Sequence, residues 1–434
     1  TTYGFANLAS DGHLPASYIA AAVAMIFTAL SYGAMVRKYP VAGSAYTYTQ
    51  QSFGGAVGFL TGWAMLLDYL FIPMINFMVI GTYMQTRFPN IPWQVFMLIA
   101  LVGVFALNAL GIKLINRVNF VIIAISVVMV VMFVTLSLQS MGGSEGAASA
   151  IEPFMGELGP VFAGAGILAL SFLGFDAIST LSEEAKNARR DIPRAIVLAT
   201  VFGGIIFIVV SWAGAMAYSP DWGSMSEADL DSAGVGAMLA VGGEAFANFG
   251  VAVYVAGAFG SGLTGSTSVS RILYSMGRDG VLPKPFARIW TRSGTPIVAA
   301  AAVSAFALLG LVIPLLTVST MISFGALAAF SLVNLSVIRT YLFPKGGRAT
   351  PATAGEWLRY GVLPLIGFAM TLWLWTSLSG QTFMYGGIWL LLGVLVLAWS
   401  TKFFRRPVPK MDFSEEGATT GFIDAVGEDH PAAR

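Results

Sequence analysis

The sequence predicts an all-α protein that crosses a membrane about twelve times, and three observations support this fold class. The 434 residues are 56% hydrophobic and only 10% charged, whereas soluble domains carry about 25% charged residues. Apolar stretches of the length that a spanning helix needs recur along the whole chain. The basic residues gather in alternate connecting segments, as they do in polytopic membrane proteins.

Eleven stretches are long and apolar enough to cross a bilayer, which takes roughly 20 mainly apolar residues. In chain order they are 15–36, 57–83, 93–111, 118–138, 161–181, 196–218, 249–275, 296–315, 318–338, 360–378 and 384–404. The opening residues 1–10 resemble the last turns of an earlier helix. We therefore expect about twelve spans in the intact protein, with the first one truncated here.

The distribution of charge predicts the topology. If the first complete span runs inward, 22 of the 23 lysines and arginines fall on the inner side, and Arg87 alone falls outside. The outer segments 139–160 and 219–248 are acidic. By the positive-inside rule the protein lies in the cytoplasmic membrane with a cytoplasmic C-terminus. Segment 219–248 suits a solvated connector better than a short lid helix, and the polar tail from residue 407 is expected to be disordered.

Composition and motifs exclude several classes of function. The chain has no cysteine and only two histidines, His13 and His430, so we expect no disulfide, thiolate metal site or histidine cluster. A net charge of +1 gives no bulk attraction to nucleic acid. No GxxxxGK[ST], HExxH or GxSxG motif occurs. ATP hydrolysis, hydrolase chemistry and a bound cofactor or metal are therefore not expected.

Two carboxylates fall inside predicted spans, where an ionisable side chain is costly and is a functional candidate. Asp176 follows Gly164, Gly166 and Gly174, and glycine weakens a helix by about 1 kcal/mol relative to alanine. We expect a discontinuous helix whose backbone groups and carboxylate face a cavity, although such glycines also suit close helix packing. Asp68 lies mid-helix as a second anionic site, a proton carrier or a structural hydrogen-bond acceptor.

Other side chains give weaker signals. Two separated carboxylates would suit a diamine, and the aromatic residues Phe172, Phe175, Trp63 and Tyr69 could contact an amine through their rings, although most such rings simply pack. Span 249–275 carries a run of hydroxyl residues interleaved with glycines. This run favours close helix packing over a sodium site.

Three segments carry a family resemblance. YPVAGSAYTYTQQSFGGAVGFLTGWAMLLDYLFIPMIN, LSFLGFDAISTLSEEAKNARRDIPRAI and SVSRILYSMGRDGVLP, in this order, resemble the amino acid–polyamine–organocation superfamily, and most of all its bacterial putrescine importers. The resemblance covers residues 1 to about 404. It implies two inverted five-helix repeats, here 1–138 and 161–338, followed by two peripheral helices in 360–404 and a cytoplasmic tail, 405–434.

The resemblance also implies a mechanism. In this superfamily the first and sixth helices unwind around a central site and access alternates between the two sides, usually with proton coupling in the polyamine branch. By motif position, Gly174, Phe175 and Asp176 fall in the unwound sixth helix, where many relatives have glutamate. Asp68 is characteristic of the putrescine-like subgroup. A lysine that some proton-coupled relatives carry in the fifth helix is missing from 118–138, which leaves the coupling ion open.

These points together predict an importer of putrescine or a similar polyamine, driven by the proton gradient. Asp176 and Asp68 would face the ammonium groups, and the other predicted site residues are Phe175, Gly174, Phe172 and Tyr69. The expected partners are a small cation, a proton and the lipid bilayer, and the oligomeric state is not specified. The nearest rival is an amino acid permease or exchanger of the same fold, which needs a cap for the substrate carboxylate. A membrane sensor or a membrane enzyme lacks a supporting domain or catalytic motif in the sequence.

Overall fold

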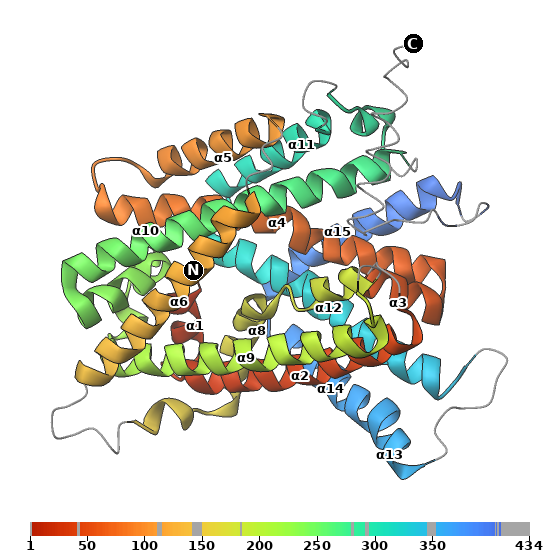
Figure 1. The fold of residues 1–434 in the computed structure, drawn as a ribbon, viewed down its shortest axis with the longest axis horizontal. Coiled ribbons are helices and arrows are strands. Elements are labelled where there is room, and N and C mark those ends of the chain that lie inside the picture. Colours follow the sequence, from red (N-terminus) through yellow and green to blue (C-terminus); the bar gives the residue numbers. More distant parts are fainter. Residues whose placement is uncertain are drawn as a thin grey trace.

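The molecule is a bundle of long helices that run roughly side by side (Figure 1). The computed structural model describes residues 2–40, 44–110, 115–140, 150–182, 185–278, 282–290, 295–344, 353–403, 405 and 408. Within these ranges the regular structure is helical, apart from an isolated β-bridge between Trp290 and Thr295. The all-α expectation is confirmed. The predicted disordered tail from residue 407 lies outside the described residues, except for Val408.

All eleven predicted spans appear as apolar helices. In the described ranges, ten helical segments are long and apolar enough to cross a membrane, and 297–311 forms a shorter apolar one. The helices are α2 (Leu14–Lys38), α4 (Gly55–Arg87), α5 (Trp93–Leu110), α6 (Ile115–Ser140), α8 (Leu158–Leu168) with its 3₁₀ continuation, α9 (Ala188–Ala217), α10 (Glu227–Arg278), α11 (Ile297–Ala307), α12 (Leu315–Tyr341), α14 (Leu363–Thr376) and α15 (Gly380–Ser400). Three short helices, α1 (Tyr3–Ala9), α3 (Ser44–Phe53) and α13 (Ala354–Trp357), lie between or beside them.

Corresponding helices of the two halves of the chain pack against each other. Helix α1 contacts α8, α2 runs along α9, α4 crosses α10, and α5 contacts α11. Figure 1 shows the α2–α9 pair along one side of the bundle. This pairing is the pattern expected from two inverted repeats. The repeat bounds 1–138 and 161–338 remain predictions.

Helix α4 forms the centre of the bundle and packs against α3, α5, α10 and α12. It is apolar nearly all round, which is typical of a helix buried on every side. Small residues allow the close approaches: Gly262 of α10 faces Phe77, and Gly265 faces Pro73. The hydroxyl run of α10 therefore includes a packing surface, as expected.

Side-chain hydrogen bonds also join the helices of the bundle. Thr267 of α10 donates to the amide oxygen of Asn108 at 2.6 Å. Trp63 of α4 and Trp389 of α15 stack, and each indole N–H donates to the backbone carbonyl oxygen of the other. Trp63, which the sequence suggested as an amine contact, therefore attaches the peripheral helix α15 to α4.

Two helix boundaries differ from the prediction. Helix α9 begins at Ala188 rather than near 196, and it includes Pro193 in its second turn. Helix α10 begins at Glu227, so the prediction of a connector over much of 219–248 is wrong. This acidic arm packs on α1 and turns at Gly243, where φ is 65°.

The arm of α10 before Gly243 lies beyond the part that crosses the membrane. The helix has 52 residues, whereas roughly 20 suffice for a span. The arm begins beside the 3₁₀ turn Trp222–Ser224, at the end of the molecule that the charge pattern assigns to the outside. It therefore forms a helical cover over that end of the bundle.

The topology can be tested with single cysteines, because these 434 residues include none. We expect Ser224→Cys, at an exposed outer position, to react with a membrane-impermeant maleimide in intact cells. Lys284→Cys, exposed on the predicted cytoplasmic side, should react only after permeabilisation. The cysteine-free parent is the labelling control, and the reverse pattern would invert the assigned orientation.

Candidate functional site

The span that contains Asp176 is broken in the middle. Helix α8 ends at Leu168, a 3₁₀ turn covers Ala169–Phe172, and Leu173 is extended. Gly174 follows with a φ of +109°, before a second 3₁₀ turn over Asp176–Ser182. A residue with a Cβ rarely adopts that backbone conformation, so glycine permits the break. The predicted discontinuous helix is confirmed.

Free space reaches the backbone at this break. Gly174 and Ala177 are exposed, whereas Phe175 and Asp176 between them are buried. A Cβ built on Gly174 would meet no atom within 4 Å. The break therefore presents accessible backbone directly beside a buried carboxylate, which is the arrangement of a site that a small ligand can enter.

Asp176 is held by two long hydrogen bonds. Its Oδ2 accepts from the Ser44 hydroxyl at 3.3 Å, and its Oδ1 accepts from the Gly174 backbone N–H at 3.3 Å. Both exceed the usual separations of strong bonds to a carboxylate. The backbone N–H groups of Asp176 itself and of Ala177 also direct hydrogen bonds to this carboxylate, whose residue is only 4% exposed.

Asp68 lies on α4 and interacts electrostatically with Asp176. It is 5% exposed, and its Oδ1 is buried without a hydrogen-bond partner among the described residues. In the same part of the chain, the one ion pair joins Arg87 to Glu244 and involves neither aspartate. The two predicted carboxylates are thus close enough to influence each other and share no basic partner there.

Aromatic rings surround the break. Phe175 meets Tyr32 of α2 edge-on at 5.6 Å between centroids and is tilted against Phe330 of α12 at 5.2 Å. Phe172 packs edge-on against Phe207 of α9. Tyr69 is half-buried and interacts electrostatically with Tyr32. Of the predicted aromatic residues, Phe175 is in direct contact with the rings beside Asp176.

The sequence analysis did not identify three residues that lie near Asp176: Ser44, Tyr32 and Tyr48. Ser44 and Tyr48 belong to α3, a short helix between two spans, and Tyr32 lies in the unremarkable apolar span α2. Tyr32 and Tyr48 both interact electrostatically with Asp176, from 128 residues or more away along the chain. No local pattern marks such residues, because only tertiary packing brings them to the carboxylate.

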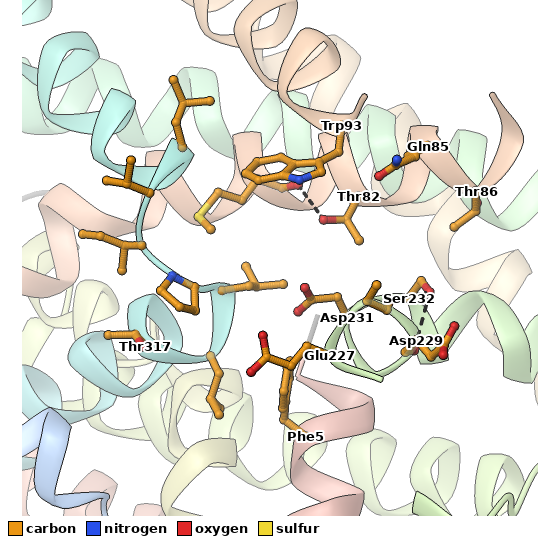
Figure 2. A pocket seen from close by; sticks show the side chains of 18 of the residues that line it. Phe5, Thr82, Gln85, Thr86, Trp93, Glu227, Asp229, Asp231, Ser232 and Thr317 are labelled. Carbon is orange, nitrogen blue, oxygen red and sulfur yellow. Dashed lines mark hydrogen bonds between the residues drawn. The ribbon is translucent and has the colours of Figure 1, made fainter. Parts of the chain in front are cut away.

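A second feature is a cavity of about 640 Å³ at the end of the bundle that the charge pattern predicts to be the outer one (Figure 2). Its walls come from α1, α4, α5, α10 and the turn before α12. Glu227, Asp229 and Asp231 of the α10 arm line it together with Trp93 and several neutral polar side chains, and none of its described lining residues is basic. The described lining of the cavity is therefore negative.

Asp231 is the most enclosed acid of this cavity. Its Oδ1 is buried without a hydrogen-bond partner among the residues that the structure describes. Burial, together with the neighbouring Glu227 carboxylate, raises the pKa of Asp231 to about 6. The side chain thus changes charge in a physiologically accessible range of pH.

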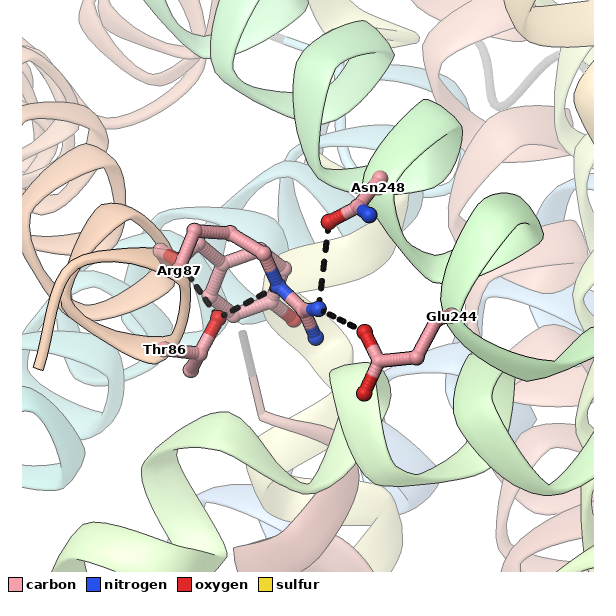
Figure 3. Close-up of polar contacts among 5 residues, drawn as sticks. Thr86, Arg87, Glu244 and Asn248 are labelled. Atoms are coloured by element: carbon pink, nitrogen blue, oxygen red, sulfur yellow. Dashed lines mark hydrogen bonds and ion pairs between the residues drawn. The ribbon is translucent and has the colours of Figure 1, made fainter.

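Arg87 does not neutralise these acids (Figure 3). Its guanidinium lies 2.7 Å from a Glu244 carboxylate oxygen and donates to Asn248 at 3.1 Å. Glu244 directly follows the turn at Gly243, so the contact attaches α10 just after this turn to the C-terminal end of α4. The single predicted outer basic residue serves this attachment and leaves the cavity acidic.

The broken span, the paired helices and the buried acids define a polytopic helical transporter. A model of the amino acid permease family matches residues 5–406. The chain belongs to this family, within the amino acid–polyamine–organocation superfamily that its motifs indicated.

Several curated proteins are similar over most of their length. The chain is 38% identical over 417 residues to the low-affinity putrescine importer PlaP of Escherichia coli K12, covering 95% of this chain and 91% of that protein. It is 27% identical to the branched-chain amino acid permease BcaP of Lactococcus lactis, covering 88% and 85%. It is 28% identical to the lysine-specific permease LysP of the same species, covering 68% and 61%. These relatives are transporters of small organic molecules.

The role of Gly174 can be tested by adding a Cβ. We expect Gly174→Ala to lower the thermal midpoint in detergent, because alanine at this φ costs about 1 kcal/mol or more although the site has room. Gly159→Ala in α8 also meets no atom within 4 Å but has no positive φ, so it should keep or raise the midpoint. Equal midpoints for both variants would show that the break does not depend on glycine.

Proposed function

We propose that this protein is a secondary transporter that imports putrescine or a related small polyamine across the cytoplasmic membrane. The observation that carries the proposal is the pair of buried carboxylates, Asp176 and Asp68, without an ion-pair partner among the described residues. A charged side chain at the centre of a spanning helix costs about 3 kcal/mol by insertion scales. A bound organic cation offsets that cost, and so does a proton.

The chemistry of a diamine fits two separated acids. Each primary ammonium group donates up to three hydrogen bonds, and it could replace the two long bonds at Asp176. The Phe175 ring beside Asp176 offers an aromatic face to the cation. The apolar chain between the ammonium groups would lie against the rings around the break, so Gly174, Phe172 and Tyr69 are its proposed neighbours.

The outer acidic cavity supplies the proposed route of entry. A cleft lined by charges of one sign raises the local concentration of ligands of the opposite sign. Glu227, Asp229 and Asp231 give the cavity that character, while Arg87 is engaged by Glu244. The orientation, with the cavity outside and the C-terminus in the cytoplasm, follows from the positive-inside rule.

We propose coupling to protons because the acids of the site can carry either a proton or an ammonium group. For import, the proton and the amine must cross together, so one carboxylate would carry the proton while the other holds an ammonium group. A change of access that occurs only when both cations are bound would couple their transport without ATP hydrolysis. The oligomeric state is not part of the proposal.

An amino acid permease is the second candidate, since the chain resembles BcaP and LysP as well as PlaP. Such a protein must bind a substrate carboxylate, commonly with free backbone N–H groups at a helix break. Here the Gly174 N–H donates to Asp176 itself, so an internal carboxylate already uses that donor. This contact favours a cationic substrate over an amino acid.

The site assignment can be tested by uptake of radiolabelled putrescine into proteoliposomes that contain the protein with its native N-terminal sequence, with and without an inward proton gradient. We expect gradient-stimulated accumulation in the wild type. Asp176→Asn and Asp68→Asn should each lower kcat/KM by about 30-fold or more, because each leaves a bound ammonium without its countercharge.

The matched control for these variants is Glu152→Gln, which removes an exposed acid outside the site and should retain wild-type uptake. Unchanged kinetics in both aspartate variants would refute the site assignment. Uptake of neutral amino acids without uptake of putrescine would favour amino acid transport as the function.

The outer route predicts a specific pH dependence. With a pKa of about 6, Asp231 is negative above this pH and becomes neutral below it, and Glu227, Asp229 and Tyr83 are the neighbouring titratable groups. We expect the KM for putrescine of Asp231→Asn to exceed that of the wild type by about two- to fivefold at pH 8. The ratio of the two KM values should approach one at pH 5, whereas a constant ratio would exclude an electrostatic role for Asp231.

A further inference from the structure

Two buried tyrosine hydroxyls near Asp176 lack hydrogen-bond partners. Tyr32 of α2 and Tyr48 of α3 are both 0% exposed, and neither hydroxyl makes a hydrogen bond of good geometry to a described residue. Their polar neighbours are the side chains of Ser44, for Tyr32, and Ser179, for Tyr48. Buried polar atoms in native proteins are almost always satisfied. Two adjacent exceptions beside an acid without an ion-pair partner therefore point to a missing partner.

The two side chains pack together as one wall beside Asp176. Their rings meet edge-on at 5.8 Å, and the Tyr32 ring also packs against Phe175 at 5.6 Å. Both hydroxyls interact electrostatically with the Asp176 carboxylate. Ring packing fixes the directions of the hydroxyls, so they are already arranged for a ligand.

The wall lies on the side from which a substrate of an importer would leave. Helix α3 follows the basic pair Arg37 and Lys38 at the end of α2, and it lies at the same end of the bundle as α13 (Figure 1). The positive-inside rule assigns this end to the cytoplasm. Ser44, the first residue of α3, lies on this side of Asp176, and its hydroxyl donates a hydrogen bond to Oδ2 of Asp176.

We propose that Tyr32 and Tyr48 complete an ammonium-binding subsite at Asp176 and select primary ammonium groups. This inference rests on the proposed amine transport and adds its specificity determinants. A primary ammonium group directs one N–H to Asp176 and the remaining N–H groups to the two phenol oxygens, which act as acceptors. The contact with Ser44 is replaced when the amine binds.

The subsite distinguishes amines by their number of N–H donors. A tertiary ammonium group has one N–H, so it can satisfy Asp176 but leaves both tyrosine hydroxyls unpaired. The methyl groups of the tertiary ammonium would also face the two tyrosine hydroxyls, in the positions where a primary ammonium group has N–H donors. A site built to form hydrogen bonds rejects an analogue that lacks them far more strongly than an apolar pocket does.

The test compares two amines of equal length and charge on the reconstituted protein. Unlabelled putrescine and N,N,N′,N′-tetramethylputrescine compete against radiolabelled putrescine uptake in the wild type and in the double variant Tyr32→Phe/Tyr48→Phe. Phenylalanine keeps the ring contacts, so the fold is retained. We expect the wild type to bind putrescine at least about tenfold more tightly than the methylated analogue, and the double variant to reduce this ratio to about threefold or less.

The control variant is Tyr341→Phe, which removes a buried hydroxyl that donates to the Ala34 carbonyl oxygen at 3.0 Å. It should lower stability but leave the selectivity ratio unchanged. A wild-type ratio that the double variant retains would overturn the inference while leaving amine transport intact. A wild type that takes up no putrescine would instead overturn the proposed function and the inference with it.

Discussion

The rest of the site depends on one electrostatic constraint: two carboxylates are buried in a membrane-spanning bundle without basic partners among the described residues. Asp68 and Asp176 interact with each other, and the one ion pair in the same part of the chain lies at the outer end. A buried charge needs a countercharge or a proton. The constraint explains why a small cation suits this protein and why a proton can compete with it.

The helix break makes this constraint useful for transport. A continuous helix would bury its backbone, whereas the turn at Gly174 exposes backbone beside Asp176 and frees groups that a ligand can contact. Helices α2, α3, α4 and α12 all contribute side chains around that point. Because these elements come from both halves of the chain, a relative movement of the halves would change the environment of Asp176. Alternating access requires such a change.

Much of this fold could be predicted from the sequence, because spanning helices follow from apolar length and basic loops. The break at Asp176 could also be predicted, since its glycines are a local signal. The helical arm of α10 was missed because its polar, acidic composition resembles a loop, and packing on α1 stabilises it. Tyr32, Tyr48 and Ser44 could not be found, because long-range packing alone brings them to Asp176.

The most direct test of the central claim is ligand-induced stabilisation of the purified protein, which does not depend on transport. The thermal midpoint is measured with putrescine and with its uncharged counterpart 1,4-butanediol, for the wild type and for Asp68→Asn/Asp176→Asn. Binding to the folded state raises the midpoint, so the account predicts a rise with putrescine in the wild type alone. An equal rise in the double variant, or an equal effect of the diol, would contradict it.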